Sequence, residues 1–198
     1  MDPALVTGGA ADGREPNFAE IMGALRRPGV LWNVPVHLFI LIPTTCLIAW
    51  MATLVDRKLG WQPFIGAPWN MILFAVLFPL GIFVVWYTYG YLAILGEGSP
   101  ATHLGGTKNL VVTGPFALCR HPSIIGKFLG VCALGFLVGS PTFAFVIIPL
   151  LTTYSLLTAR FLQERLCVTL WGEQYIAYRH SVPLVIPSFF RAGKKPSR

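Results

Sequence analysis

Residues 113–126 read Thr-Gly-Pro-Phe-Ala-Leu-Cys-Arg-His-Pro-Ser-Ile-Ile-Gly and separate two long apolar regions of the chain. The Gly-Pro pair breaks the preceding segment, because glycine accepts unusual dihedrals and proline fixes φ and removes a hydrogen-bond donor. Proline is favoured in the first turn of a helix, so we expect Pro122 to start a helix with Arg120 and His121 at its N-terminus. A loop with an arginine that snorkels at a membrane surface would account for the same residues.

The apolar residues on both sides of this stretch gather in three uncharged runs. Of the 198 residues, 55% are hydrophobic and only 12% are charged, which is unlike an ordinary soluble protein. Residues 28–55, 59–96 and 128–159 contain no Asp, Glu, Lys or Arg. A helix needs ~20 apolar residues to span a bilayer, and each run is long enough. The sequence therefore predicts an integral membrane protein.

Proline and glycine divide these runs into expected helices. The third run would make a helix of about 48 Å, too long for one straight span, and Gly139-Ser140-Pro141 divides it into a hairpin. We therefore expect an all-α bundle of four transmembrane helices, at about 34–55, 69–95, 122–138 and 141–162. Asp56, Arg57 and Lys58 then begin the first loop, and no acidic residue lies within a span.

The spans divide the chain into three parts. Residues 1–33 form an N-terminal tail, in which 17–27 are either a short interfacial helix capped by Asn17 or a linker. Residues 34–95 hold the first two spans. Residues 96–198 hold the hairpin and the polar segments on either side of it, and they contain the candidate site.

Basic residues lie almost entirely on one side of the predicted bundle. The formal net charge of +7 would suggest a nucleic-acid partner for a soluble protein, but in a membrane protein its placement matters more. With four spans, only Arg57 and Lys58 of the 15 lysines and arginines fall on the side opposite the termini. The positive-inside rule therefore places both termini and the 96–120 loop in the cytoplasm. The expected partner is the bilayer rather than nucleic acid, and the oligomeric state stays open.

Cysteines and aromatic residues in the apolar runs are expected to serve the bundle itself. The four cysteines show no paired spacing, so packing as small apolar side chains is expected in place of disulfides or a metal site. Trp86, Tyr87, Tyr89 and Tyr91 cluster near the end of the second span, as is typical of an interfacial aromatic belt. The alternative is that some of these rings line a pocket.

Polar residues return after the last expected span. Glu164 directly follows this span, where its carboxylate would meet either Arg120 or a cationic ligand. The apolar positions that follow indicate an amphipathic helix broken at Gly172, and they are Leu166, Leu170, Tyr175 and Tyr178.

Several short motifs, by their order and spacing, resemble the membrane methyltransferase superfamily, which includes isoprenylcysteine carboxyl methyltransferases and phosphatidylethanolamine N-methyltransferases. The motifs read Thr113-Gly114-Pro115-Phe116, Arg120-His121-Pro122-Ser123-Ile124, Gln163-Glu164, Trp171-Gly172-Glu173-Gln174-Tyr175 and Val182-Pro183. They cover roughly residues 96–187, about half of the chain. Three positions depart from the family pattern, since Phe116 replaces a tyrosine, Ile124 an aromatic residue and Gln163 a glutamate.

The resemblance implies that residues 96–198 bind S-adenosyl-L-methionine on the cytosolic side and transfer its methyl group to a lipophilic acceptor. It implies cofactor contacts at Lys108, Asn109, Leu110, Val111, Phe116, His121, Pro122, Ser123, Ile124, Gln163 and Glu164. It implies catalytic roles for His121, Arg120, Arg160 and Glu164. Either an isoprenylcysteine carboxylate or a phospholipid amine fits as the acceptor, with Arg160 near its anionic head.

These residue types are also consistent with methyl-transfer chemistry. The reaction is an in-line displacement, so a protein accelerates it mainly by holding the nucleophile and the methyl group at near-attack distance. Glu164 suits a cationic cofactor group, the Tyr175 ring stabilises cations, and His121 is either a base or a cofactor contact. We expect the acceptor's tail to enter from the bilayer through a gap beside Gly126 and Gly130.

Two other functional classes fit a bundle of this kind. A sterol-type membrane reductase shares a related C-terminal architecture by resemblance but uses NADPH. A non-catalytic scaffold or small transporter is the second alternative. Against a transporter, the sequence shows no inverted repeat and no acidic residue within an expected span. Binding of S-adenosylmethionine rather than NADPH would separate the first class from the methyltransferases.

Overall fold

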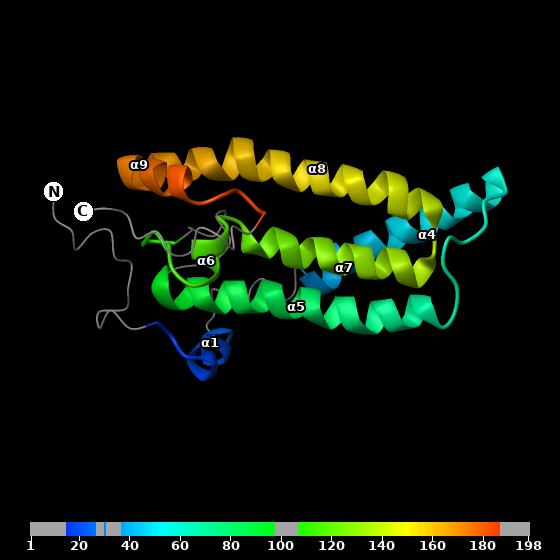
Figure 1. Ribbon diagram of the computed structural model, residues 1–198, viewed down its shortest axis with the longest axis horizontal. Coiled ribbons are helices and arrows are strands. Elements are labelled where there is room, and N and C mark those ends of the chain that lie inside the picture. The colour runs from blue at the N-terminus through cyan, green and yellow to red at the C-terminus, as the bar shows by residue number, and fades with distance from the viewer. Residues whose placement is uncertain (1–14, 27–29, 31–36, 98–106, 187–198) are drawn as a thin grey trace. The chain divides into compact units, whose positions relative to one another are not determined.

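The computed structural model describes residues 15–26, 30, 37–97 and 107–186, and every regular element among them is helical (Figure 1). In chain order the elements are α1 (Phe18–Ala24), η2 (His37–Leu41), α4 (Ile42–Leu59), α5 (Trp69–Leu95), α6 (Pro115–Leu118), α7 (Pro122–Val138), η4 (Phe143–Ile147), α8 (Ile148–Thr158), η5 (Ala159–Gln163) and α9 (Glu164–Ser181). The elements labelled η are π-helical turns. The predicted all-α class is confirmed.

The chain folds as two compact units. The first unit contains α1, the end of α5 from residue 86, and residues 107–123 and 158–186. The second contains residues 37–85 and 124–157, which include α4, the start of α5, and most of α7 and α8. All predicted site residues except Ile124 lie within the first unit.

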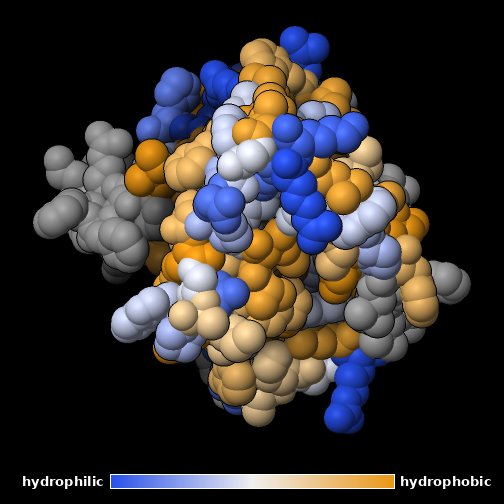
Figure 2. All heavy atoms as spheres, turned by 90° about the vertical axis from the view of Figure 1, so that its right-hand side faces the viewer, coloured by the Kyte–Doolittle hydropathy of each residue, from blue (hydrophilic) through white to orange (hydrophobic). Residues whose placement is uncertain are grey.

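Among the described residues, three helices are long and apolar enough to cross a membrane, namely Phe39–Leu59, Trp69–Leu95 and Phe143–Ser181. The fourth expected span is the shorter apolar helix α7, whose bounds match the prediction. Large apolar side chains on the three long helices stay exposed, among them Phe39 at 77% and Phe145 at 71%. Figure 2 shows much of one face covered by apolar side chains. The prediction of a helical membrane protein is confirmed.

The first long helix ends later than predicted. Asp56, Arg57 and Lys58 belong to α4, which continues to Leu59. Gly60 ends the helix in a left-handed conformation, with φ 69°, and its N–H donates to carbonyls of the last turn. Basic side chains near a helix C-terminus are favourable, so the charged triplet does not stop the helix as expected. The predicted start at residue 34 lies outside the described residues.

Asp56 also corrects the prediction that no acidic residue lies within a span. Its carboxylate is 5% exposed and accepts hydrogen bonds from the hydroxyls of Ser140 and Thr142 and from the Thr142 N–H at 3.0 Å. Ser140 in turn accepts the Phe143 N–H at 3.1 Å. The carboxylate is tolerated because it satisfies the donors at the turn of the hairpin. The turn itself is where it was predicted, after Val138 and with Gly139 at φ 66°.

Gly126 and Gly130, beside which we expected a gap for the acceptor's tail, differ in their surroundings. A Cβ added to Gly126 would lie 2.7 Å from the Gly81 carbonyl oxygen, so α5 and α7 touch backbone to backbone at this point. A Cβ added to Gly130 would meet no atom within 4 Å. The expected lipid-facing gap beside Gly126 is therefore wrong, because α5 fills it.

The last helix is longer than predicted. From Phe143 it continues for 39 residues to Ser181 and passes the expected end at Leu162. Two π-helical turns, η4 and η5, interrupt its α-helical hydrogen bonding but not its path. The predicted break at Gly172 is confirmed, since this residue has φ 53° and ψ −128°. The polar C-terminal segment is therefore helical in direct continuation of the apolar sequence, with a kink at Gly172.

The N-terminal segment is a helix rather than a linker. Asn17 caps α1 by accepting the Glu20 N–H at 2.9 Å, and the Glu20 carboxylate accepts the Asn17 N–H at 2.8 Å. Ile21 is 1% exposed, and Gly90 of α5 leaves room for it, because a Cβ there would lie 2.6 Å from the Ile21 carbonyl oxygen. Helix α1 thus packs against the end of α5 within the first unit.

Tyr91 shows that the aromatic cluster at the end of α5 is not simply an interfacial belt. The ring is 2% exposed and packs with Ile21, Leu95 and Val111 in the core of the first unit. Its hydroxyl is hydrogen-bonded to the Thr113 hydroxyl at 2.9 Å. A Cβ added to Gly114 would lie 2.4 Å from the Tyr91 ring. Tyr91 therefore holds the hinge stretch in place, and the prediction of a belt is wrong for it.

Candidate active site

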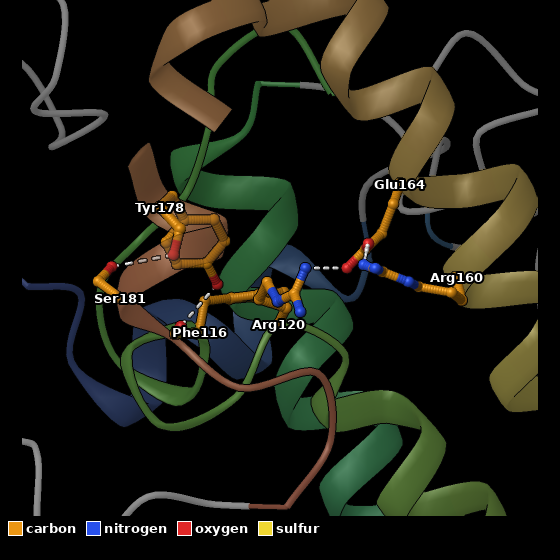
Figure 3. A network of polar contacts seen from close by, with 6 residues as sticks. All are labelled: Phe116, Arg120, Arg160, Glu164, Tyr178 and Ser181. Carbon is orange, nitrogen blue, oxygen red and sulfur yellow. Dashed lines mark hydrogen bonds and ion pairs between the residues drawn. The ribbon is translucent and has the colours of Figure 1, made fainter. Parts of the chain in front are cut away.

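The hinge stretch turns sharply before α7. Gly114 has φ 57° and ψ −128°, a backbone conformation that side-chain-bearing residues rarely adopt. The single turn α6 follows, and the Tyr178 hydroxyl donates to the Phe116 carbonyl at 2.7 Å (Figure 3). Helix α7 then begins at Pro122, as predicted. The hinge is therefore tied to both α5 and α9 of the first unit.

The Val-Pro motif near the C-terminus lies along the same hinge. The backbone N–H of Arg120 donates to the Pro183 carbonyl at 2.9 Å, and that of His121 donates to the Leu184 carbonyl at 3.0 Å. These bonds satisfy two donors just before α7, where a helix leaves its first N–H groups without partners. The chain after α9 thus fixes the position of Arg120 and His121.

Glu164 forms a buried charge cluster with two arginines. One carboxylate oxygen is bound by Arg120 from the hinge, and the other accepts from Arg160 at 2.6 Å (Figure 3). The exposed fraction of the side chain is 2% for Glu164, 8% for Arg120 and 48% for Arg160. The sequence predicted either Arg120 or a cationic ligand as the partner of Glu164, and the structure shows an ion pair with Arg120. Two guanidinium groups on one carboxylate leave one net positive charge at this position.

Burial changes the proton affinity of groups in the hinge. Desolvation lowers the pKa of the Arg120 guanidinium from its ordinary value, although an arginine starts so high that it stays charged at neutral pH. Burial raises the pKa of the Cys119 thiol to about 11, so this thiol is neutral near pH 7. The Nε atom of Arg120 is buried without a hydrogen-bond partner among the described residues. The hinge therefore presents a fixed cation and no thiolate.

A pocket opens between the hinge, the end of α5 and the α9 helix. It encloses a volume of about 130 Å³ and is partly open to solvent. Its lining residues are Thr88, Tyr89, Leu92, Thr107, Leu110, Val111, Phe116, Arg120, His121, Pro122, Ser123, Gln163, Leu166, Cys167, Leu170, Trp171, Tyr175 and Tyr178. The two motif regions, about forty residues apart in sequence, thus meet around one cavity.

Most of the residues predicted to form the site line this pocket. They are Leu110, Val111, Phe116, Arg120, His121, Pro122, Ser123 and Gln163. Lys108 and Asn109 instead anchor the loop. The Lys108 carbonyl accepts from the Trp171 indole N–H at 3.2 Å, and the backbone N–H of Asn109 donates to the Gly96 carbonyl at 3.2 Å.

Three other predicted positions lie outside the lining. Glu164 and Arg160 form the charge cluster together with Arg120 and do not line the pocket. Ile124 is 7% exposed and also does not line the pocket. Direct cofactor contacts of Glu164 and Ile124, and a catalytic role of Arg160, stay predictions.

Sequence reasoning missed most of the aromatic wall of the pocket. The rings of Trp171 and Tyr175 lie 6.3 Å apart, and those of Tyr175 and Tyr178 lie 5.9 Å apart edge to face. Tyr89 joins them from α5, which corrects the belt prediction for this residue also. A signal was present, since Gln163, Cys167 and Trp171 recur every four residues and so share one helix face.

Comparison with known proteins assigns the chain to a family. A sequence profile of the family described as "Phospholipid methyltransferase" matches residues 69–173, more than half of the chain. The chain belongs to the phospholipid methyltransferase family. Methyltransferase activity and a lipid environment are the common properties of this family, in agreement with the apolar helices.

The phospholipid methyltransferase match runs from the first residue of α5 through Trp171 and Glu173. It includes the hinge, the helical hairpin and the charge cluster. Tyr175, Tyr178 and the Val-Pro segment lie beyond its end, although the structure places both tyrosines in the pocket wall.

A shorter similarity links the chain to the nickel-cobalt-cadmium resistance protein NccN of Alcaligenes xylosoxydans xylosoxydans. The two are 36% identical over 58 residues, which cover 28% of this chain and 27% of NccN. The chain thus matches only about a quarter of that relative's length. No solved structure shows significant similarity to the chain.

Proposed function

We propose that this protein transfers a methyl group from S-adenosyl-L-methionine to a lipophilic acceptor at the cytosolic face of the membrane. The observation that carries the proposal is the shared pocket, which His121, Pro122 and Ser123 of the hinge line together with Gln163 and the aromatic residues of α9. Neither segment alone would enclose a ligand. Membership of the phospholipid methyltransferase family supplies the reaction type.

The residues present fit this cofactor. Phe116, Trp171, Tyr175 and Tyr178 provide aromatic faces, which attract cations and stack on planar rings. Arg120 lines the same pocket and has a buried Nε without a hydrogen-bond partner among the described residues, which suits an anionic group. When bound, the cofactor supplies an electrophilic methyl group on a sulfonium, and the protein supplies orientation and field.

The predicted site residues divide into cofactor contacts and supporting residues. Gln163 and His121 to Ser123 hold the cofactor, with Leu110 and Val111 as an apolar side. Lys108 and Asn109 anchor the chain before the hinge through their backbone hydrogen bonds to Trp171 and Gly96. Ile124 supports the start of α7. Because both carboxylate oxygens of Glu164 are bound by arginines, we assign it the task of positioning Arg120 rather than contacting a cation.

The acceptor is proposed to be a membrane lipid with a reacting amine, in line with the family description. Arg160 is half exposed beside Glu164 and suits the anionic head of such a lipid. An isoprenylcysteine carboxylate has the same combination of apolar tail and anionic head. It is the alternative that the experiment below separates.

The test is to incubate membranes containing the full-length protein with radiolabelled S-adenosylmethionine and extract them with organic solvent. Label is expected in the lipid extract, and thin-layer chromatography will separate methylated phospholipid amines from prenylcysteine methyl esters. His121→Ala should lose the label, whereas His180→Ala, an exposed histidine on α9 that does not line the pocket, should keep it. Label only in water-soluble products would contradict a lipophilic acceptor.

A further inference from the structure

Three exposed leucines follow one another along the last helix. Leu162, Leu166 and Leu170 are 61%, 48% and 59% exposed and are spaced four residues apart, so they share one side of the helix. Leu166 and Leu170 also line the pocket, whereas Leu162 does not. The latter two therefore face the outside and the cavity at once, and we call this pair the leucine lip.

Contact with bilayer lipid explains the exposed leucines earlier in the helix better than it explains the leucine lip. On α8, Leu150 and Leu157 are 61% and 50% exposed within an apolar segment. The lip lies after Arg160 and Glu164, where charges interrupt the apolar sequence and α9 has become polar. Exposed leucines at a polar helix are explained more directly by an apolar ligand than by the bilayer core.

The neighbouring positions of α9 give the lip a defined orientation. Gln163, Cys167 and Trp171 lie on the pocket side of the lip, while Arg165 and Thr169 are exposed and do not line the pocket. Across the cavity, Leu92 of α5 adds a further apolar side chain. The pocket therefore changes from a polar floor at Arg120 and His121 to an apolar edge at the lip.

We propose that Leu166 and Leu170 form the surface over which the hydrocarbon chain of the acceptor leaves the pocket, and that they select acceptors by chain length. This inference rests on the proposed function, because it assumes that the acceptor's head reaches the pocket floor. A long chain covers both leucines and removes their apolar surface from water, whereas a short chain covers neither. The lip therefore sets a preference for long-chain lipids.

The first arm of the test locates the chain directly. The full-length protein in lipid nanodiscs is irradiated with phosphatidylethanolamine that carries a diazirine in its acyl chain, and adducts are mapped by mass spectrometry. Adducts at Leu166 and Leu170 should exceed those at Leu157 and should disappear with excess unlabelled phosphatidylethanolamine. Equal labelling at all three leucines, with no competition, would overturn the proposal whether or not methyl transfer occurs.

The second arm measures selectivity with a matched control. Methyl transfer is compared for phosphatidylethanolamines with six-carbon and eighteen-carbon chains in mixed micelles. In the double variant Leu166→Ala/Leu170→Ala, the long-to-short ratio of kcat/KM should fall about tenfold, because several buried methylene contacts are lost. Leu157→Ala should keep the wild-type ratio, and an unchanged ratio in the double variant would contradict the lip.

The two arms keep this inference separate from the proposed function. Competed adducts at the lip without any methyl transfer would leave the chain-binding surface standing and contradict the proposed reaction. Methyl transfer with an unaltered chain-length preference in the double variant would support the proposed reaction and contradict the role of the leucine lip.

Discussion

Arg120 and Glu164, 44 residues apart in the chain, form an ion pair whose side chains are 8% and 2% exposed. This pair joins the hinge to the beginning of α9 and thereby sets two walls of the pocket. Glu164→Gln leaves a buried guanidinium without its counter-charge, so we expect a loss of about 3–5 kcal/mol in stability. Thermal unfolding of the purified protein in detergent measures the loss, and a wild-type transition would show that the pair is dispensable.

Arg160 provides a matched comparison on the same carboxylate. It bonds Glu164 at 2.6 Å, but its side chain is 48% exposed, so solvent screens the interaction. We expect Arg160→Ala to cost only ~0–1 kcal/mol of stability while lowering methyl transfer to a phospholipid amine, whose phosphate it is proposed to bind. The same unfolding assay and a methylation assay on one preparation separate the two effects. A stability loss as large as that of Glu164→Gln would contradict the distinction.

Asp56 is expected to be a stability determinant of the hairpin. Its carboxylate satisfies the Ser140 and Thr142 hydroxyls and the Thr142 N–H. Asp56→Ala leaves buried donors unsatisfied, so unfolding free energy should fall by about 1–3 kcal/mol. Arg57→Ala is the control, because that side chain is exposed on the same turn. Equal transition temperatures for the two variants would rule out this role for Asp56.

Gly126 and Gly130 provide a second matched pair within one helix. A Cβ at Gly126 would lie 2.7 Å from a backbone oxygen of α5, whereas a Cβ at Gly130 meets nothing within 4 Å. Gly126→Ala should therefore destabilise by about 1–3 kcal/mol, as overpacking does. Gly130→Ala should be neutral or stabilising by up to ~1 kcal/mol, since alanine favours the helix. The unfolding midpoints of the two variants measure this difference. A Gly130→Ala variant less stable than Gly126→Ala would show that α5 and α7 do not touch at Gly126.

Much of this architecture was accessible from sequence where a single physical signal dominated. The bounds of α5 match the expected span, because Pro68 precedes its start and the uncharged run ends at Gly96, directly after its end. Pro122 and Gly139 fixed both ends of α7 through their restricted or permissive backbones. Asn17 capped α1 as its residue type suggested.

Other features depend on contacts that no local pattern records. Asp56 stays helical and buried because Ser140 and Thr142, more than 80 residues later, supply its hydrogen bonds. The space beside Gly126 is occupied by the backbone of Gly81 and is not open to lipid. Tyr91 lies in the core because Gly114 leaves room for its ring. In each case a tertiary partner that no local sequence pattern indicates decided the outcome.

The orientation of the site in the membrane stays a prediction with a simple test. Of the 15 basic residues, only Arg57 and Lys58 fall opposite the termini in the four-span arrangement. We therefore expect reporters placed after Arg198 and within the 96–120 loop both to report the cytoplasm. A reporter inserted between residues 60 and 68 should report the other side. Opposite locations for the first two reporters would contradict the four-span arrangement.

Binding of S-adenosylhomocysteine to the purified protein, measured by calorimetry with NADPH as the competing candidate, tests the central claim most directly. The account predicts binding of S-adenosylhomocysteine and none of NADPH. Affinity should fall more than tenfold, by roughly 2–5 kcal/mol, in His121→Ala and stay unchanged in His180→Ala. Binding of NADPH instead, or wild-type affinity in His121→Ala, would contradict the assignment of this pocket as the methyl-donor site.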